Sequence, residues 1–390
     1  MVLFARFLAF SVIGTAMLLP LLVLPAMVGV LVDEAGLSES SAGWLAAFGA
    51  LGGAAVSFAM ALRMHRLAPR RIAVIAISIA ILTDVLSALN AGPTTLFFTL
   101  RLIAGIATTA AYVLAIASFA RFDNYERGYG LFVTLQFIVS GFGLYILPVY
   151  SAELGAQGMF LLFALADGAA LASAFLLPSA VPQKQSAPES RGELRVLLSV
   201  AVIAAVIGFC MFEMANTAEF TYVERFGVSI GLSDDAIGAV LLIASLIGIP
   251  GAFTIVVVGD RFGVVTPLSI GVGLAIAGLS TFIVSKSYTT YFIGSCFLGF
   301  SWAFCLPYIQ AFLASLDRDG SALAAGSTAS TLGAAIGPAV AAAVLGEGRY
   351  AAVFGVSILF FFVTIALFAV SRASTARPKS AARSTAEVTL

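Results

Sequence analysis

The sequence predicts an all-α membrane protein in which twelve transmembrane helices form two parallel six-helix repeats. The first observation behind this prediction is the composition. Hydrophobic residues make up 61% of the 390 residues and charged residues only 10%, and the mean hydropathy is +1.07. A soluble domain carries about 25% charged residues. Because this chain has too few polar residues to cover a surface in water, we expect lipid to be its solvent.

The second observation is a repeat at a spacing of 195 residues, half the length of the chain. Under this shift residues 36–39 (Gly-Leu-Ser-Glu) align with residues 231–234 (Gly-Leu-Ser-Asp), and residues 65–68 (His-Arg-Leu-Ala) align with residues 260–263 (Asp-Arg-Phe-Gly). The matches lie in polar joints between apolar stretches, where composition alone would not produce them. Two halves of like design in an apolar chain are typical of duplicated membrane transporters.

The third observation is the number of apolar segments. A bilayer core of about 30 Å needs about 20 helical residues, because each residue rises about 1.5 Å. The first segment is long enough to span, so we interpret it as a retained helix rather than a cleaved signal peptide. Prolines inside the spans are tolerated because neighbouring helices satisfy the freed carbonyls. In chain order the expected spans are residues 7–32, 42–64, 72–90, 94–120, 128–150, 157–178, 195–222, 236–258, 264–284, 288–315, 321–345 and 348–370.

Polar breaks divide the chain into four parts. Residues 1–178 are expected to form an N-terminal six-helix bundle and residues 195–370 a C-terminal one. Between them, residues 179–194 form a long polar break and predict a cytoplasmic linker. The last residues, 371–390, are rich in Ser, Thr, Ala and Arg and predict a disordered cytoplasmic tail.

The basic residues predict the orientation in the membrane. If the N-terminus is cytoplasmic, sixteen of the 20 Lys and Arg residues lie on the cytoplasmic side, three lie on the opposite side, and Arg101 lies within a span. The positive-inside rule therefore places both termini in the cytoplasm. We expect a multi-pass protein of the plasma membrane, in bacteria the inner membrane.

Several functional classes are excluded or disfavoured by residues that are absent. The formal net charge is zero, so nothing indicates a nucleic-acid partner. The three cysteines lie in apolar runs and the one histidine lies in a loop, so we expect neither a metal nor a cofactor. The sequence has no GxxxxGK[ST] phosphate-binding loop, so ATP is not the expected energy source. A membrane enzyme would need a buried nucleophile or a histidine, and a sensor would need a signalling domain. Both classes are therefore disfavoured, and we predict that the chain is not an enzyme.

Short motifs in the loops and helices resemble those of a known family. Residues 260–263 keep the D-R-x-G core of the loop motif G-x-x-x-D-R-x-G-R-R, and residues 61–71 hold a degraded copy. Arg101 and Gly105 match the R-x-x-x-G that begins helix 4 of the same family. Together with the six-plus-six spans, these motifs resemble the major facilitator superfamily (MFS) over essentially the whole chain. The proline-bearing first span resembles its twelve-helix drug:proton antiporter branch.

This resemblance implies a secondary active transporter in which two six-helix halves rock to alternate access. We predict proton-coupled export of an amphipathic or drug-like compound. Proton-coupled import of an organic acid or a sugar on the same scaffold is the alternative. The expected partners are a small-molecule substrate, protons and the lipid bilayer, and a monomer is expected.

Ionisable groups inside the spans are the candidates for coupling, because each costs at least a few kcal/mol in a membrane. Asp84 and Arg101 flank the joint at residues 90–94 at similar distances, so both lie about 10 Å below the same surface and can form an ion pair. The resemblance to the family's helix-4 arginine implies proton coupling, whereas a permanent structural pair is the alternative. Glu213 is a third candidate for proton coupling. For Asp167 we expect a hydrogen-bonded structural role.

A substrate cavity is predicted around helix 7, which lines the cavity in the family. Glu213, Asn216 and Glu219 are spaced by three residues and therefore share one helix face. The alternative for Glu219 is a side chain that reaches out of the span near its end. Aromatic and polar residues of three other spans are further candidates, although packing is the alternative for each. The full predicted set for the cavity is Tyr112, Gln136, Asn216, Glu219, Trp302 and Tyr308.

A cytoplasmic gate is implied by the resemblance in the loop after helix 2 and in its second copy. In the family these charges pair with neighbouring helix ends and stabilise the outward-open state. Positive-inside topology already accounts for the arginines, but it does not account for an aspartate at residue 260. The predicted gate consists of Asp260, Arg261, Gly263, Arg66 and Arg70.

Overall fold

The computed structural model describes residues 2–63, 68–119, 125–177, 198–259, 261–263, 265–316, 321–346 and 348–387, and its regular structure there is entirely helical. Among the described residues, eleven helices are long and apolar enough to cross a membrane, and the bent pair α1–α2, counted as one span, brings the number to twelve. The twelve predicted spans are therefore confirmed. In chain order the helices are α1 (Val2–Leu22), α2 (Leu24–Asp33), α3 (Glu39–Arg63), α4 (Pro69–Asn90), α5 (Thr95–Phe119), α6 (Tyr125–Val149), α7 (Ser151–Ala174), α9 (Val200–Ser229), α10 (Asp234–Val258), α11 (Val265–Val284), α12 (Tyr288–Leu316), α13 (Ser321–Leu345) and α14 (Tyr350–Glu387).

The internal repeat is visible in both the helix bounds and the packing. Shifting α3 (Glu39–Arg63) by 195 residues reproduces the bounds of α10 (Asp234–Val258). The contacts repeat as well: α3 packs on α5 as α10 packs on α12, and α4 contacts α5 and α7 as α11 contacts α12 and α14. The predicted fold class of two parallel six-helix repeats is confirmed.

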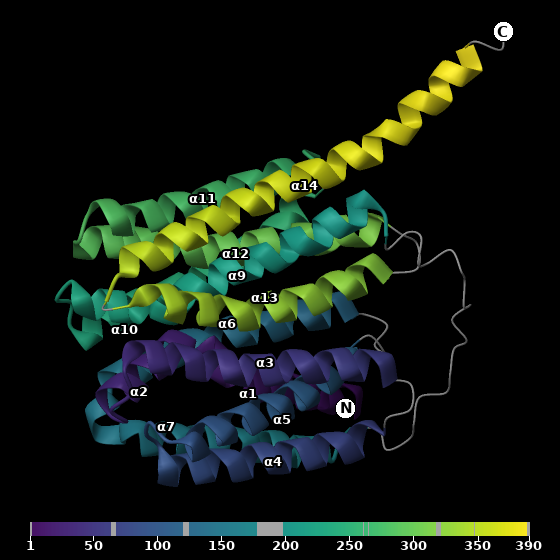
Figure 1. The fold of residues 1–390 in the computed structure, drawn as a ribbon. Coiled ribbons are helices and arrows are strands. Elements are labelled where there is room, and N and C mark those ends of the chain that lie inside the picture. The colour runs from purple at the N-terminus through teal and green to yellow at the C-terminus, as the bar shows by residue number, and fades with distance from the viewer. Residues whose placement is uncertain are drawn as a thin grey trace.

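The two repeats form two bundles that lie side by side along their length (Figure 1). Helices α1–α7, purple to blue, make one bundle, and α9–α14, teal to yellow, make the other. Between them α3 packs against α13 and α6 packs against α10. Since α3 and α10 are equivalent in the repeat, as are α6 and α13, these two contacts are related by the pseudo-symmetry of the chain.

The first span is broken at Val23, where α1 and α2 meet at an angle of 52°. Pro20 lies in the last turn of α1, and Pro25 lies in the first turn of α2. A proline removes a backbone donor and bends a helix. At the break, the Ser140 hydroxyl of α6 donates a hydrogen bond to the carbonyl of Leu22 at 2.7 Å. A neighbouring helix therefore provides a hydrogen-bond donor to the carbonyl at the break, which lipid could not provide.

Two boundaries differ from the sequence-based expectation. The helix α9 continues to Ser229, beyond the expected end at residue 222, because Glu224 and Arg225 pair with each other and stay buried. The backbone of α14 is helical as far as Glu387, where a disordered tail was expected from residue 371. This extension projects away from the bundle (Figure 1), and the predicted disorder of the tail stays a prediction. The expected linker at residues 179–194 lies outside the described residues.

The helices α3 and α5 approach closely because glycines face each other at their contact. A Cβ atom added at Gly105 would overlap the carbonyl oxygen of Gly49, and one added at Gly53 would overlap the Thr109 hydroxyl. Small residues at such crossings let the backbones of membrane helices pack closely. Gly105 of the R-x-x-x-G motif is therefore a packing residue, and it lies one turn from Arg101.

We predict that Gly105→Ala lowers the stability of the folded protein, because the new methyl group has no space against the backbone of α3. Overpacking of this kind costs about 1–3 kcal/mol. The measurement is the thermal unfolding midpoint in detergent. Gly355→Ala is the matched control, since a Cβ atom at this helical position meets nothing within 4 Å. Equal midpoints for the two variants would contradict the assignment.

Candidate functional site

A buried ion pair lies within the N-terminal bundle. The guanidinium Nη2 of Arg101 on α5 is 2.6 Å from the carboxylate Oδ1 of Asp84 on α4, and the side chains are only 7% and 3% exposed. This is the pair that equal depth on neighbouring helices predicted. A charge buried in this way must be paired, because an isolated one would be very costly.

The surroundings of Arg101 hold the guanidinium in place but do not satisfy all of it. The same Nη2 donates to the backbone carbonyl of Thr83 at 3.1 Å. The guanidinium carbon lies 4.5 Å from the centre of the Phe160 ring on α7, a cation–π contact. The buried Nε of Arg101 has no hydrogen-bond partner. One donor of the arginine is therefore available to a further acceptor.

Asp167 on α7 joins this pair, which the sequence analysis did not anticipate. Its carboxyl group lies within hydrogen-bonding reach of Asp84 and interacts electrostatically with Arg101. The residue is 2% exposed, and its Oδ2 has no hydrogen-bond partner. The N-terminal bundle thus holds two carboxyl groups and one guanidinium in a single buried cluster, which we call the α4–α5–α7 cluster (Asp84, Arg101, Asp167).

The C-terminal bundle holds its own buried polar groups on α9. Glu213, Asn216 and Glu219 are each at most 6% exposed. The amide of Asn216 donates to the carbonyl of Phe212 at 2.7 Å within the helix. Trp302 on α12 lies close to the Glu213 carboxyl group, whereas Oε2 of Glu219 has no hydrogen-bond partner. Glu219 is therefore buried rather than turned out of the span.

Trp302 connects Glu213 to the contact between the bundles. Its ring lies 6.0 Å from that of Phe137 on α6, centre to centre, in an edge-to-face arrangement. The carbonyl of Phe137 also accepts a hydrogen bond from Ser245 on α10 at 2.9 Å. Next to Phe137 in sequence, the buried Nε2 of Gln136 has no partner. Trp302, which was predicted for the cavity, thus contacts α6 of the other bundle.

The two predicted tyrosines have different surroundings. Tyr308 on α12 is 2% exposed, its ring centre lies 5.2 Å from that of Phe304, and its hydroxyl has no partner. Tyr112 is half-buried and packs against the apolar core of the N-terminal bundle. Tyr308 therefore offers an unused hydroxyl to a ligand, while Tyr112 takes part in packing within its own bundle.

A second ion-pair network joins the two bundles. Arg225 on α9 forms two hydrogen bonds to the carboxylate of Asp33 at the end of α2, at 2.8 and 2.7 Å. It also forms two to its own neighbour Glu224, at 2.7 and 2.8 Å. The hydropathy pattern placed Arg225 in a joint outside the membrane, but it is only 4% exposed. Its burial follows from this double pairing, which no sequence pattern revealed.

Further hydrogen bonds between the bundles lie beside this network. Glu39 at the start of α3 accepts from two tyrosines: its backbone carbonyl from Tyr222 at 3.0 Å and its carboxylate from Tyr350 at 2.5 Å. The Ser40 hydroxyl donates to the carbonyl of Ala342 on α13 at 3.0 Å. We call this region the closed end, defined by the helix ends at Asp33, Glu39, Ser229, Asp234, Leu345 and Tyr350.

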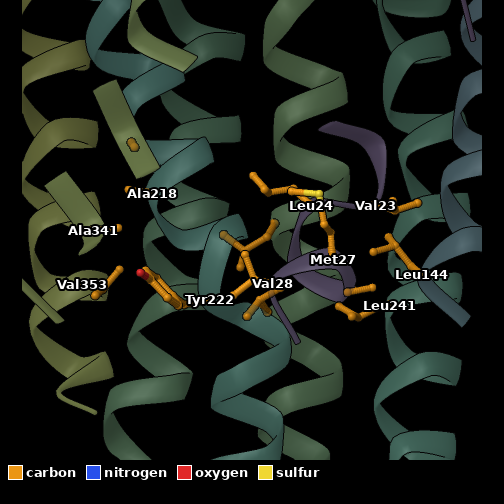
Figure 2. Close-up of a cluster of buried hydrophobic side chains, with 14 of the residues drawn as sticks. Val23, Leu24, Met27, Val28, Leu144, Ala218, Tyr222, Leu241, Ala341 and Val353 are labelled. Atoms are coloured by element: carbon orange, nitrogen blue, oxygen red, sulfur yellow. The ribbon is translucent and has the colours of Figure 1, made fainter. Parts of the chain in front are cut away.

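Apolar side chains of α2 seal the closed end from within. All residues from Leu24 to Leu31 are buried. Figure 2 shows Val28 between Tyr222 of α9 and Leu241 of α10, with Leu144 of α6 close to Leu241. These residues belong to one apolar cluster that includes side chains of both bundles. The bend at Val23 thus places α2 where it can contact both bundles.

The opposite end of the two bundles differs from the closed end in the contacts between the bundles, as far as the described residues show. The described hydrogen bonds and ion pairs that join the bundles involve residues from the closed end to the helix middles at Phe137 and Ser245. Among the predicted gate residues, Arg70 donates to the carbonyl of Leu177 in its own bundle at 2.9 Å. Arg261 is exposed, and Gly263 has a positive φ of 65°. Asp260 and Arg66 lie outside the described residues, so the predicted gate stays a prediction.

The described residues contain no group of three or more His, Cys, Asp or Glu side chains that could hold a metal ion. The chemistry that the described polar groups support is therefore hydrogen bonding and proton exchange by carboxyl groups. The buried carboxyl groups include Asp84 and Asp167 of the α4–α5–α7 cluster in one bundle, and Glu213, Glu219 and Glu224 in the other.

Comparison with known proteins adds a family and a fold. The family model described as Major Facilitator Superfamily matches residues 2–318 and 227–389. The structure is similar to a crystal structure of a point mutant of the nucleoside transporter NupG, with a TM-score of 0.72 and 16% sequence identity over 95% of this chain and 99% of that chain. A second crystal structure of NupG gives a TM-score of 0.70 and 15% identity, over 96% and 98% of the two chains. No curated protein matches the sequence.

We predict that Arg225→Gln destabilises the protein far more than Asp33→Asn. Removing the arginine leaves the carboxylate of Glu224 buried and unpaired, which costs about 3–5 kcal/mol. The Asp33 side chain is 48% exposed, and its loss leaves Arg225 still paired with Glu224. For Asp33→Asn we therefore expect a cost of about 1 kcal/mol.

The measurement is the thermal unfolding midpoint of the two variants in detergent, with wild type alongside. If Asp33→Asn lowered the midpoint as much as Arg225→Gln, the pairing with Glu224 would not be what stabilises the buried arginine.

Proposed function

Because the chain belongs to the Major Facilitator Superfamily, a family of membrane transporters, we propose that it moves a small molecule across the membrane by alternating access coupled to protons. The observation that carries this proposal is the closure of the two bundles against each other at one end. A transporter of this kind must hold one end closed while the other admits substrate, and then exchange the two arrangements.

The contacts at the closed end are suited to reversible opening. When the bundles separate there, Arg225 loses Asp33 but keeps Glu224, which lies on the same helix. Asp33 is already about half exposed to solvent, so its carboxylate can be hydrated at once. No buried charge is left unpaired, and the penalty for opening stays small. Glu39 accepts hydrogen bonds from the hydroxyl groups of Tyr222 and Tyr350, and water molecules can replace both hydroxyl groups when the bundles separate.

Protons are the coupling ion that the buried groups support best. Carboxyl groups that are removed from water take up or release protons when their partners change. Glu213 lies in the C-terminal bundle beside Trp302, which also contacts Phe137 of the other bundle. In the N-terminal bundle, Asp84 and Arg101 form a buried charged pair. We assign Arg101, Asp84 and Glu213 to proton coupling.

The substrate is expected to bind between the bundles, near the middle of the membrane. Unused hydrogen-bonding atoms of Gln136, Glu219 and Tyr308 and the ring of Trp302 support a ligand that combines an apolar or aromatic body with a few polar groups. This description fits export of an amphipathic or drug-like compound. It also fits import of a polar ring compound, and the shared fold with a nucleoside transporter adds nucleosides to the organic acids and sugars considered for import.

The distribution of basic residues supports an orientation with both termini in the cytoplasm. The N-terminus and the linker side of the bundle then face inward, and the closed end faces outward. The conformation described above is in that case closed toward the outside. A monomer suffices for this mechanism, since both bundles belong to one chain.

We predict that Glu213→Gln and Arg101→Ala each reduce proton-coupled flux by at least about tenfold. Glutamine keeps the size of Glu213 and can accept a hydrogen bond from Trp302, but it cannot bind a proton. The matched control is Glu153→Gln, which neutralises an exposed acid in the first turn of α7. The control is expected to transport like wild type.

The measurement uses proteoliposomes that contain a pH-sensitive dye. Ethidium, uridine, lactate and glucose are added in turn, and proton movement on addition identifies the compound class and the direction. Flux that is equal in wild type, Glu213→Gln and Arg101→Ala would contradict the coupling assignment. Accumulation that persists without a pH gradient and follows a sodium gradient would contradict coupling to protons.

A further inference from the structure

We propose that Asp167 and Asp84 form a carboxyl–carboxylate pair that binds one proton beside Arg101, so that the α4–α5–α7 cluster is a proton-binding site within the N-terminal bundle. The role of this site in transport rests on the function proposed above. The existence of the site does not rest on that function, because it follows from the positions of the three residues in the cluster.

The geometry brings the three groups together from three helices. Arg101 on α5 is 2.6 Å from Asp84 on α4, and Asp167 on α7 lies within hydrogen-bonding reach of Asp84. All three residues are at least nine-tenths buried, with 2% of Asp84, 7% of Arg101 and 2% of Asp167 exposed. The packing of α4 against both α5 and α7 produces this convergence.

The charges in the cluster do not balance unless a proton is present. One guanidinium faces two carboxyl groups, so full ionisation would leave one negative charge in the membrane interior, which is costly. Two carboxylates are both acceptors and cannot hydrogen-bond to each other. If one of them holds a proton, its O–H can donate to the other, and the cluster becomes neutral. Two acidic groups that share a site in this way titrate as a pair.

Among the side chains that the structure describes, no other charged group of the neighbouring helices can take the place of this proton. In the described structure, Asp84 and Arg101 are the only charged groups that interact with Asp167. The other described acidic and basic side chains on the helices packed around it lie near helix ends: Asp33, Arg70, Arg71 and Glu153. Of these, Arg70 is bound to the carbonyl of Leu177 at the end opposite the closed end.

The proton is assigned to Asp167 rather than to Asp84. Asp84 accepts the short charged hydrogen bond from Arg101, which favours its ionised form. Asp167 has the unpartnered oxygen Oδ2, and Arg101 has the unpartnered donor Nε. These two buried atoms suggest how release occurs: the O–H bond of Asp167 breaks, the proton leaves to water, and the guanidinium moves to bind the new carboxylate. The proton and the arginine would then exchange places on Asp167.

Infrared spectroscopy of the full-length protein in lipid tests the proposal without a substrate. At about pH 7 an exposed aspartate is ionised, so a C=O stretching band of a protonated aspartic acid can come only from a buried one. Wild type labelled with ¹³C at the aspartate side-chain carboxyl is expected to show such a band, shifted by the label, with the intensity of one acid per molecule. Absence of a label-shifted band would overturn the proposal.

The variant Asp167→Asn assigns the band to a residue. Its amide can still donate to Asp84, so the cluster stays hydrogen-bonded while the proton-binding oxygen is lost. We expect the label-shifted band to disappear in this variant and to persist in the control Glu213→Gln. A band that persists in folded Asp167→Asn would overturn the assignment. Because these spectra need no substrate, a failure of the transport proposal would leave their outcome unchanged.

Discussion

The rest of this structure depends on one constraint: a charge inside the membrane must have a partner within the protein. Only 10% of the residues are charged, and lipid cannot hydrate those that lie inside the helices. In the described part of the chain, each of the two buried arginines therefore binds a carboxylate. Arg101 binds Asp84 within one bundle, whereas Arg225 binds Glu224 on its own helix and Asp33 across the interface. The first pair joins α4 to α5 within one bundle. The second allows the bundles to separate without leaving a buried charge unpaired.

The two bundles share a scaffold but do not share their chemistry. Helices α3 and α10 have equivalent bounds and equivalent neighbours, yet a shift of 195 residues places Arg101 on Cys296 and Leu18 on Glu213. The repeat thus preserves the joints and the two interfaces between bundles. The ionisable groups differ between the halves, so the proposed proton coupling would use different residues in each bundle.

Much of the fold could be predicted from the sequence, because hydropathy reports span length directly and the polar joints reveal the duplication. The Asp84–Arg101 pair could also be predicted, since helical rise gives the depth of a residue on neighbouring helices. The contact of Asp167 with Asp84 could not, because it depends on how α7 packs against α4. Glu224 and Arg225 were missed for a related reason. Hydropathy counts charges as polar, and only the tertiary pairing shows that they are buried.

The central claim is that the closed end opens when the opposite end closes. It is tested most directly by measuring two distances in the protein in lipid by pulsed electron spin resonance, after the three native cysteines are replaced. Spin labels at Glu34 and Asp235 report on the closed end, and labels at Arg71 and Phe262 report on the opposite end; all four residues are exposed. The account predicts two populations for each pair, with the first distance lengthening as the second shortens when pH or a transported compound is varied. Single distances that stay fixed under all conditions, or distances that lengthen together, would contradict it.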